Sequence, residues 1–378
     1  MNYELTTEEK KKFSRHLLLP EVGIEGQKKL KAAKILCVGA GGLTSPASLY
    51  LAAAGIGHLG IVDSDEVDLS NLQRQILYDT TDIGRKKTAA ARDRLLQLNP
   101  HLEIQIHETF LTAKNGKEIA ASYDLILDGS DNFSTRYLIN DLAFFLKKPL
   151  IYGSLFRFEG QCTLFETHVE GPCYRCLFPE PPPQGLIPSC SEAGVLGVVP
   201  GIIGTLQATE ALKWILEIGT SLRGRLLQWN ALTMKFREFQ IRKNPRCPLC
   251  GPRPTITQLV EEKLSCTLSM NSNTSSIPII TVEELQQKLQ QQHPITLVDV
   301  REPEEYETAH IEGSHLIPLG ELMSRINELP HDQEIALLCH SGGRSAQALL
   351  WLRKAGFSKL YNVEGGILAW KSCFAARV

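Results

Sequence analysis

The chain of 378 residues lacks both a long uninterrupted hydrophobic run and a strong excess of one charge. Its most apolar long stretch, residues 193–208, is interrupted by Gly and Pro and is too short to cross a bilayer. The first residues, MNYELTTEEKKKFSRH, have no apolar segment of the kind that a secretory signal peptide requires. The net charge of −2 gives no electrostatic case for nucleic-acid binding, because phosphate-binding surfaces are strongly basic. We therefore expect a cytoplasmic protein that binds neither membranes nor nucleic acids.

The composition gives no sign of disorder or of a fibrous protein. Hydrophobic residues make up 43% and charged residues 22% of the chain, which is ordinary for globular proteins. A length of 378 residues is long for one domain, so we expect more than one folded unit. Ten cysteines in a cytoplasmic protein indicate free thiols, metal ligands or catalysts rather than a disulfide framework.

Short β-branched runs alternate with helical patterns between Lys34 and Glu166. The runs are KILCVG, HLGIVD, EIQIHETF and DLILDGS. Their alternation predicts a mostly parallel sheet with helices on both faces, a Rossmann-like doubly wound α/β fold. A Ser/Thr/Asn-rich tract then indicates a linker, after which the α/β pattern restarts. We expect a domain over residues 1–251, a linker over 252–278, and a second, small α/β domain over 279–378.

A glycine-rich loop follows the first predicted strand directly. Residues 39–44 read GAGGLT and lead into a helical pattern. Glycines let a backbone approach a phosphate closely, and a helix N-terminus offers free N–H groups to it. Asp63 ends the next strand about 20 residues on, where an acid can hold ribose hydroxyls. The loop therefore predicts nucleotide binding, although Thr44 replaces the third glycine of the dinucleotide fingerprint and should alter the helix–strand contact.

Charged side chains after this loop favour ATP over NAD. Arg74 and Lys87 follow the ribose acid, and a triphosphate needs more positive charge around it than a dinucleotide does. A later strand delivers Asp131 and Asn132 to the carboxyl edge of the sheet, the usual ligand-binding rim of this fold. A carboxylate there can hold Mg²⁺ that bridges phosphates. The alternative for Arg74 or Lys87, taken singly, is a solvated surface charge.

Two Cys-x-x-Cys pairs lie far apart in the chain, Cys173 with Cys176 and Cys247 with Cys250. Each pair can place two thiolates on one tetrahedral zinc ion, and four sulfurs leave no open position for catalysis. Redox dithiols are the alternative, but neither pair has a thioredoxin-like context. We predict a structural zinc site that ties the end of the first domain to its core, so that chelation destabilises that domain.

From about residue 10 to 250, the chain resembles the adenylyltransferases that activate ubiquitin-like sulfur-carrier proteins. The matching stretches are FSRHLLLPEVG, GAGGL, VDSDEVDLSNLQRQ, GSDNFSTRY, PCYRCLFPEPP and CSEAGVLGVVPG. The resemblance implies a homodimer in which Arg15 reaches the partner's ATP site, and an acyl-accepting role for Cys190. Lys12 and Phe13 depart from the Arg-Tyr that the family often has. The residues that the resemblance implies in contact with ATP and Mg²⁺ are Gly42, Asp63, Ser70, Asn71, Leu72, Gln73, Arg74, Lys87, Asp131 and Asn132, with Asp131 as the Mg²⁺ ligand.

A single cysteine, Cys339, stands between an apolar run and a second glycine loop in the segment LLCHSGGRS. Backbone N–H groups of such a loop, together with a helix N-terminus, stabilise a thiolate and bind anions, so Cys339 is expected to be nucleophilic. Phosphate-ester hydrolysis and transfer of sulfane sulfur both use such a loop. Four residues separate Cys339 from Arg344, one fewer than in cysteine-dependent phosphatases, and the smaller loop favours a persulfide.

Residues 278–378 resemble a single rhodanese domain. The matching stretches are LVDVREPEEYETAHIEGSHLIPL, CHSGGRS and VEGGILAW. The resemblance implies that Cys339 carries the sulfur and that Arg344 sets the loop and its electric field. It makes Asp299 and Arg301 structural supports. The alternative is that Cys339 only ends a core strand, but the Gly-Gly-Arg-Ser sequence that follows would then be a coincidence.

Together the two resemblances imply ATP-dependent adenylation of the C-terminal glycine of a carrier ending in Gly-Gly. Sulfur from a Cys339 persulfide then gives a C-terminal thiocarboxylate, either directly or through a Cys190 thioester. A cysteine desulfurase or thiosulfate would supply the sulfur, and the molybdopterin, thiamin, cysteine and tRNA-thiolation pathways all stay open. Two alternatives are an activator that passes a thioester on for conjugation, and an NAD-dependent oxidoreductase fused to a sulfurtransferase.

Overall fold

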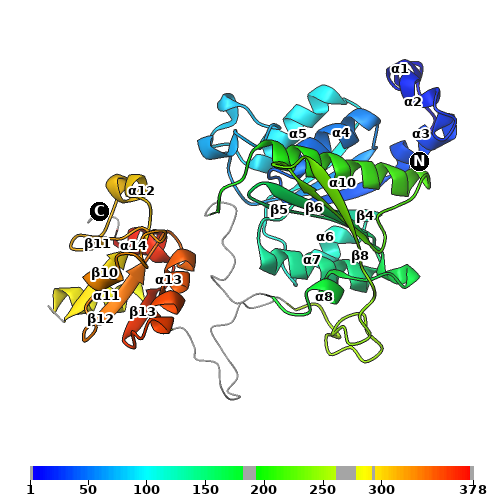
Figure 1. Cartoon of the computed structure of the whole chain (residues 1–378). Helices are drawn as coiled ribbons and strands as arrows, with labels where there is room; N and C mark the ends of the chain where they lie inside the picture. The colour runs from blue at the N-terminus through cyan, green and yellow to red at the C-terminus, as the bar shows by residue number, and fades with distance from the viewer. Residues whose placement is uncertain (1–2, 182–192, 261–277, 292–293, 375–378) are drawn as a thin grey trace. The chain divides into compact units, whose positions relative to one another are not determined.

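The computed structural model describes residues 3–181, 193–260, 278–291 and 294–374. The chain divides into two compact units: among the described residues, the first comprises residues 3–181 and 193–260, and the second the residues from 278 onward. Each unit has its own sheet and core (Figure 1). Within the described ranges, no helix has both the length and the hydrophobicity that a membrane span requires.

The first unit is built on an eight-stranded sheet with the strand order β3-β2-β1-β4-β5-β6-β7-β8. The five neighbouring strands β3, β2, β1, β4 and β5 are parallel, which confirms the predicted Rossmann-like fold. Strands β6, β7 and β8 extend the sheet in antiparallel fashion. The sequence analysis did not predict this extension. The strands are β1 (Lys34–Val38), β2 (His58–Val62), β3 (Glu103–His107), β4 (Leu125–Asp128), β5 (Leu150–Phe156), β6 (Glu159–Phe165), β7 (Arg225–Asn230) and β8 (Lys235–Gln240).

Helices cover both faces of the parallel part of this sheet, because alternate residues of its strands point to opposite sides. In β1, Ile35 and Cys37 join the core on the side of α4 (Thr44–Ala54) and α10 (Val198–Leu216), while Leu36 and Val38 join the core on the side of α7 (Phe133–Leu146). The helices on the first side include α3 (Gly23–Ala32), α4 (Thr44–Ala54), α5 (Lys87–Leu98) and α10 (Val198–Leu216), and those on the second α6 (Gly116–Ala120) and α7 (Phe133–Leu146). Short helices α1 (Thr7–Lys12), α2 (Ser14–Leu17) and α8 (Tyr174–Leu177) complete the described part of the unit.

Cys37 and Cys162 belong to this core and not to a site. Both side chains are fully buried, in β1 and β6. Burial raises the pKa of Cys37 to about 12 and also raises that of Cys162, so neither thiol ionises near neutral pH.

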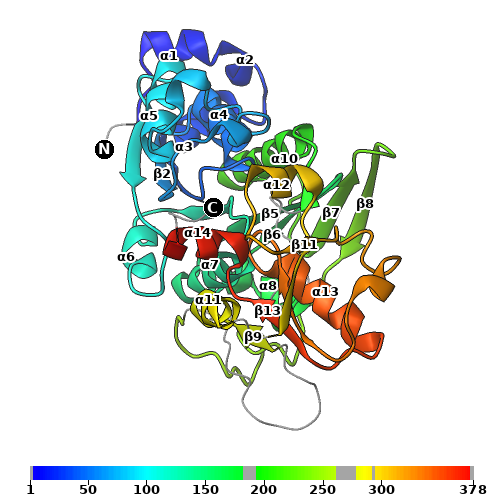
Figure 2. The ribbon, with the colours of Figure 1, turned by 90° about the vertical axis from the view of Figure 1, so that its left-hand side faces the viewer.

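The second unit has a five-stranded parallel sheet with the order β11-β10-β12-β13-β9. Figure 2 shows α11 and α14 on one side of these strands and α13 on the other, in agreement with two separate clusters of buried side chains. This confirms the small α/β unit expected from the sequence. Its elements are β9 (Ile279–Ile280), α11 (Val282–Gln290), β10 (Ile295–Asp299), α12 (Pro303–Thr308), β11 (His315–Leu316), β12 (Glu334–Leu338), α13 (Gly343–Lys354), β13 (Leu360–Val363) and α14 (Gly366–Phe374).

The first residues of the predicted linker, 252–278, pack on the first unit. The backbone amides of Thr255 and Ile256 both donate to the carbonyl of Pro248 at 2.9 Å. The Ile256 side chain lies against a cluster of cysteines. Residues 261–277 of the linker are outside the described residues.

Candidate functional site

The glycine loop connects β1 to α4 at the carboxyl edge of the large sheet. Gly39 has φ of +87°, and a Cβ at this position would lie 2.8 Å from the carbonyl oxygen of Gly129. Gly42 faces α10, where a Cβ would lie 3.2 Å from the ring of Pro200. Only glycine fits the first position, because its backbone is left-handed and because the loop after β4 comes so close. The loops that follow β1 and β4 are therefore in contact.

Thr44, which replaces the third glycine of the dinucleotide fingerprint, is hydrogen-bonded to the start of the loop. Its side chain is fully buried, and its hydroxyl donates to the carbonyl of Gly39 at 2.6 Å. A Cβ on Gly129 would overlap with this hydroxyl. The Thr44 side chain fits here because Gly129, in the loop after the neighbouring strand β4, has no side chain.

Asp63 comes directly after β2 and lies against the same loop. Its Oδ2 accepts from the amide of Ala40 at 2.7 Å, and its Oδ1 accepts from the amide of Asp65 at 2.8 Å. The phenol of Tyr78 donates to the carbonyl of Ala40 at 2.8 Å. The ribose acid predicted from sequence is thus at the mouth of the glycine loop, where it also orders that loop.

Arg74 packs beside Gly42, with its Cγ 3.6 Å from the place that a Cβ of Gly42 would occupy. One terminal nitrogen of Arg74 donates to the carbonyl of Ser70 at 3.0 Å. Ser70 is in turn held by Asp68, whose carboxylate accepts from the Ser70 amide at 2.8 Å and hydroxyl at 2.6 Å. The segment after Asp68 is a 3-10 turn (Leu69–Asn71), and it positions Arg74 next to the loop.

The start of α10 lies against the same segment. A Cβ on Gly197 would overlap with the carbonyl of Gln73, and Pro200 touches the loop as described above. Leu72 is a half-buried residue of the same turn.

Two adjacent lysines differ sharply in their surroundings. Lys87 begins α5, its side chain is only 8% exposed, and its Nζ lies 2.8 Å from Oδ2 of Asp65. Lys86 is exposed and pairs with Glu66 at 3.0 Å. Lys87 thus pairs with a residue whose amide is bonded to Asp63, whereas the Nζ of Lys86 reaches this segment only at the carbonyl of Ser64, at 3.3 Å.

Asp131 and Asn132 follow β4 at the same edge, and both are exposed. The Asn132 side chain caps α7, since its Oδ1 accepts from the amide of Thr135 at 2.9 Å. The Asp131 carboxylate accepts a long bond of 3.4 Å from the side-chain amide of Asn132. Its role as the Mg²⁺ ligand stays a prediction.

Asp128 is a residue of this site that the sequence analysis missed. It is fully buried, and its Oδ1 accepts from the amide of Ser130 at 2.9 Å and from its hydroxyl at 2.6 Å. These bonds fix the turn that carries Asp131. Arg136 lies 3.8 Å from the other carboxylate oxygen, and burial raises the pKa of Asp128. An Asp two residues before Ser, as in the segment DGSDN, is a local turn pattern that could have revealed this role.

Two residues of the predicted site are not placed with the loop. Arg15 lies in α2 with an exposed side chain, and its role in a partner's ATP site stays a prediction. Cys190 lies outside the described residues, as does Cys266.

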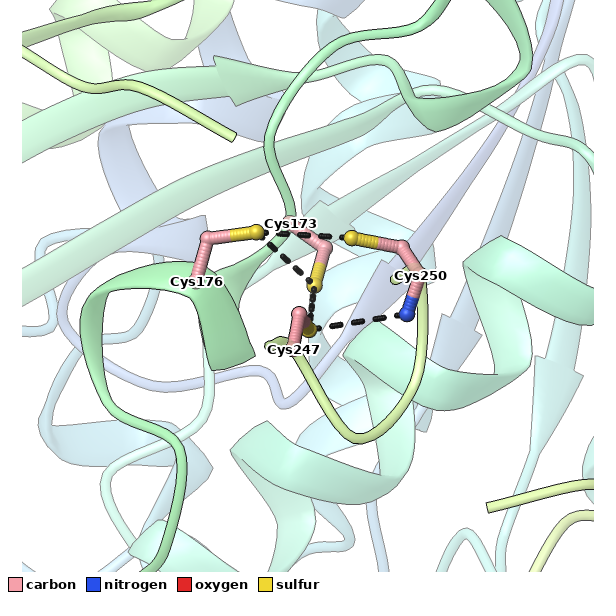
Figure 3. Close-up of side chains that lie close together, drawn as sticks. All are labelled: Cys173, Cys176, Cys247 and Cys250. Atoms are coloured by element: carbon pink, nitrogen blue, oxygen red, sulfur yellow. Dashed lines mark hydrogen bonds between the residues drawn. The ribbon is translucent and has the colours of Figure 1, made fainter. Parts of the chain in front are cut away.

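The four predicted metal ligands meet in the first unit (Figure 3). The sulfur atoms of Cys173, Cys176, Cys247 and Cys250 all lie within 4.8 Å of one another. Cys173 and Cys250 are buried, Cys176 is half-buried, and the amide of Asn244 donates to Cys176 Sγ at 3.4 Å. Four thiolates this close repel one another unless a cation separates them, and the donor set suits Zn²⁺. The two Cys-x-x-Cys pairs, far apart in sequence, thus form one site that fits a structural zinc ion.

In the second unit, Cys339 follows β12 at the start of the second glycine loop. The side chain is buried, and its Sγ accepts from the amide of Gly342 at 3.1 Å and from the hydroxyl of Ser345 at 3.3 Å. Gly342 has φ of +103° and precedes α13. The loop backbone thus points a donor at the sulfur from the N-terminal end of a helix, which stabilises negative charge there.

Arg344 pairs with an acid that the sequence analysis did not single out. Its two terminal nitrogens donate to Glu305 of α12 at 2.6 and 2.7 Å, a bidentate pair. The hydrogen bonds from Arg344 hold the pKa of Glu305 below its usual value. Asp299 and Arg301 form a second, buried pair with a shortest bond of 2.6 Å. Arg301 also donates to the carbonyls of α12 and Ala309, which supports the structural role predicted for it.

Each of the two units matches a known protein family. Residues 13–249 match the ThiF family, and residues 281–373 match the rhodanese-like domain. A probable adenylyltransferase/sulfurtransferase MoeZ of Mycobacterium tuberculosis is 44% identical over 97% of this chain and 94% of its own length. An adenylyltransferase and sulfurtransferase MOCS3 of Drosophila ananassae is 40% identical over 97% of this chain and 84% of its own length.

A sulfur carrier protein adenylyltransferase of Thermus thermophilus is 50% identical over 70% of this chain and 98% of its own length. Among solved structures, Escherichia coli MccB bound to MccA-N7isoASN superposes with a TM-score of 0.57 at 21% identity, over 66% of this chain and 76% of MccB. This likeness concerns the fold alone.

Proposed function

Because the chain belongs to the ThiF family and also carries a rhodanese-like domain, we propose that it turns the C-terminal carboxylate of a ubiquitin-like sulfur carrier into a thiocarboxylate. The chain is an enzyme with adenylyltransferase and sulfurtransferase halves. The observation that carries the proposal is the presence of both halves in one chain that relatives named for both activities match over 97% of its length.

ATP would bind at the glycine loop, with its phosphates near the loop amides and its ribose near Asp63. The carrier carboxylate attacks the α-phosphate, and pyrophosphate leaves. Arg74 and Lys87, with Arg15 from a partner chain of a homodimer, stabilise the charge that develops. Asp131 would hold Mg²⁺, which neutralises phosphate charge when bound. The other residues proposed to contact the nucleotide are Gly42, Ser70, Asn71, Leu72, Gln73 and Asn132.

Sulfur transfer would begin with a persulfide on Cys339. Its terminal sulfur attacks the carbonyl of the acyl-adenylate, AMP leaves with the electron pair, and an acyl disulfide remains. A thiolate, from Cys190 or from an external thiol reductant, then attacks Sγ of Cys339, the thiocarboxylate leaves with the electron pair, and Cys339 remains in a disulfide that a further molecule of the thiol reductant reduces. In the variant route, Cys190 first takes the acyl group as a thioester. The amide of Gly342 and the hydroxyl of Ser345, which donate to Sγ of Cys339, would stabilise the Cys339 thiolate before it receives the sulfur.

The four-cysteine site would hold Zn²⁺ in a structural role, because all four positions of a tetrahedral ion are then filled by sulfur. None of the eight described cysteines forms a disulfide, which suits a reducing, cytoplasmic setting. We place the domain boundaries at residues 1–251 and 279–378, with the linker between them.

Mass spectrometry of candidate carriers tests the proposal. Carriers of the molybdopterin, thiamin, cysteine and tRNA-thiolation pathways, each ending in Gly-Gly, are incubated with the enzyme, ATP and a sulfane sulfur donor. The expected product has one carboxylate oxygen replaced by sulfur. Carrier-dependent exchange between ATP and pyrophosphate excludes an NAD-dependent oxidoreductase. Transfer of the carrier to a second protein, without any thiocarboxylate, would instead favour a conjugation activator.

A further inference from the structure

The pairing of Arg344 bears on which molecule delivers the sulfur. Arg344 is the one Lys or Arg residue in the loop that begins at Cys339. Both of its terminal nitrogens are bonded to Glu305, at 2.6 and 2.7 Å, and its side chain is only 14% exposed. An arginine in this state cannot offer its bidentate fork to an anionic substrate without giving up Glu305.

Glu305 is itself held in place by the start of α12. Its Oε2 accepts from the amide of Glu302 at 3.1 Å, as part of a capping box. The carbonyl of Glu305 accepts from the guanidinium of Arg301 at 3.2 Å, and Arg301 is fixed by its buried pair with Asp299. The carboxylate that binds Arg344 is therefore also bonded to the start of α12, and the backbone of Glu305 is bonded to Arg301.

The charge around the loop adds to this effect. Residues 279–374 contain thirteen Asp and Glu against eight Lys and Arg, a formal charge of −5. Three further acids, Glu302, Glu304 and Glu307, lie on or beside α12 and are exposed. A small dianion meets a repulsive field here, whereas a protein donor can bring its own positive surface.

We propose that Glu305 is a specificity-determining residue: by holding Arg344 it withholds the cation that a free dianionic donor such as thiosulfate needs, so that Cys339 is loaded from a persulfide on a protein thiol. The inference rests on the proposed function, in which Cys339 carries the sulfur. Glu305 acts through Arg344 and is a positioning residue, not a catalytic one.

The two donors react by balanced displacements. With thiosulfate, the Cys339 thiolate attacks the outer sulfur, the S–S bond breaks, and sulfite leaves with the electron pair. With a protein persulfide, the same thiolate attacks the terminal sulfur, and the donor cysteine leaves as a thiolate. Neither displacement needs an added oxidant or reductant. The two reactions differ in the charge of the donor, because thiosulfate is a small dianion and the persulfide belongs to a protein. In the proposal, the Glu305–Arg344 pair disfavours the dianion.

The test compares E305Q with matched variants of the full chain. Glutamine keeps the length of the side chain and an oxygen that can still accept from the Glu302 amide, so the helix start is retained. E304Q removes the neighbouring charge of the same helix turn, and E305D keeps the carboxylate. The double variant E305Q/R344Q removes both partners. Loading is measured as persulfide on Cys339 by mass spectrometry, with thiosulfate or with a persulfidated cysteine desulfurase.

We expect E305Q to raise kcat/KM for thiosulfate about tenfold, mainly through a lower KM, because a nearby positive charge is released. Loading from the desulfurase should change less than about twofold, since a protein donor does not depend on that one charge. E304Q and E305D should keep the wild-type preference, and the double variant should lose the gain. Equal changes with both donors, the same gain in E304Q, or a gain that persists in the double variant would overturn the inference.

A second measurement needs no variant. Thiosulfate loading of the wild-type chain should become faster as ionic strength rises, because salt screens the repulsion of the dianion. A slower rate in salt would show that free positive charge attracts thiosulfate, and would also overturn the inference. The proposed function fails separately, if carrier thiocarboxylate forms with neither donor.

Discussion

The amide of Gly342 donates a hydrogen bond to Sγ of Cys339 at 3.1 Å. Because Gly342 has a left-handed backbone and stands just before α13, the sulfur lies at the positive end of a helix with a donor already aimed at it. The Ser345 hydroxyl, at 3.3 Å, adds a second donor. This arrangement suits the proposed role of Cys339, in which its sulfur alternates between thiolate and persulfide.

Lys87 should matter to adenylation far more than its neighbour Lys86. In K87Q the buried cation beside Asp65 is lost, and we expect exchange between ATP and pyrophosphate to fall by about 100-fold, since charge on the departing phosphates is left uncompensated. K86Q makes the same chemical change at an exposed lysine paired with Glu66 and should stay within about twofold of wild type. Equal losses in the two variants would argue that Lys87 has no particular role.

Removal of the proposed zinc ion should destabilise the first unit alone. A strong chelator, or C247S, opens the four-sulfur site, and we expect a loss of roughly 5 kcal/mol in the unfolding free energy of that unit. Hydrogen exchange should quicken around residues 173–177 and 247–251 and stay unchanged in β12 and α13. C373S, at an exposed cysteine of α14, is the control and should keep its zinc. A chain purified without zinc but with normal stability would contradict this prediction.

The Glu305–Arg344 pair should make stability depend on pH in the acid range. Arg344 lowers the pKa of Glu305 in the folded state, so the pair stabilises the fold above the unfolded pKa of about 4.3 and stops doing so as the pH falls through the folded value. We expect E305Q to be less stable than wild type by about 1 kcal/mol at pH 7, because the pair is partly screened by solvent. Urea unfolding should show this difference shrinking below about pH 4. A difference that is the same at pH 3 and pH 7 would rule out an ionic origin.

Gly129 should not tolerate a side chain. In G129A the new Cβ overlaps with the Thr44 hydroxyl, so we expect a loss of about 2 kcal/mol in stability and ATP binding weakened at least about tenfold as the glycine loop shifts. At Gly201, within α10, a Cβ meets nothing within 4 Å. G201A should therefore be neutral or stabilising by up to about 1 kcal/mol, as alanine favours helices. Calorimetry and ATP titration would measure both, and wild-type behaviour of G129A would refute the tight contact.

The parallel part of the large sheet could be predicted because each strand is a buried apolar run followed by a helical pattern. The antiparallel strands β6 to β8 could not, since β7 and β8 carry mixed sequences such as RLLQWN and KFREFQ, and β8 is exposed along its length. Their place in the sheet depends on pairing with distant strands and not on a local pattern.

The cluster of four cysteines could be predicted, because each Cys-x-x-Cys pair is visible in the local sequence and a four-sulfur zinc site requires both pairs. What could not be predicted depends on tertiary contacts. Lys86 and Lys87 look alike in sequence, and only the fold buries one of them beside Asp65. Likewise, nothing local announces that Arg344 would bond to Glu305, a residue far back in the chain on another helix.

The most direct test of the account is thiocarboxylate formation by C339S compared with wild type, measured by mass spectrometry of the carrier alongside exchange between ATP and pyrophosphate. We predict that C339S keeps normal exchange, because adenylation belongs to the other unit, and forms no thiocarboxylate with a protein persulfide as donor. Thiocarboxylate formed by C339S at the wild-type rate would show that the sulfur does not pass through Cys339 and would contradict the account.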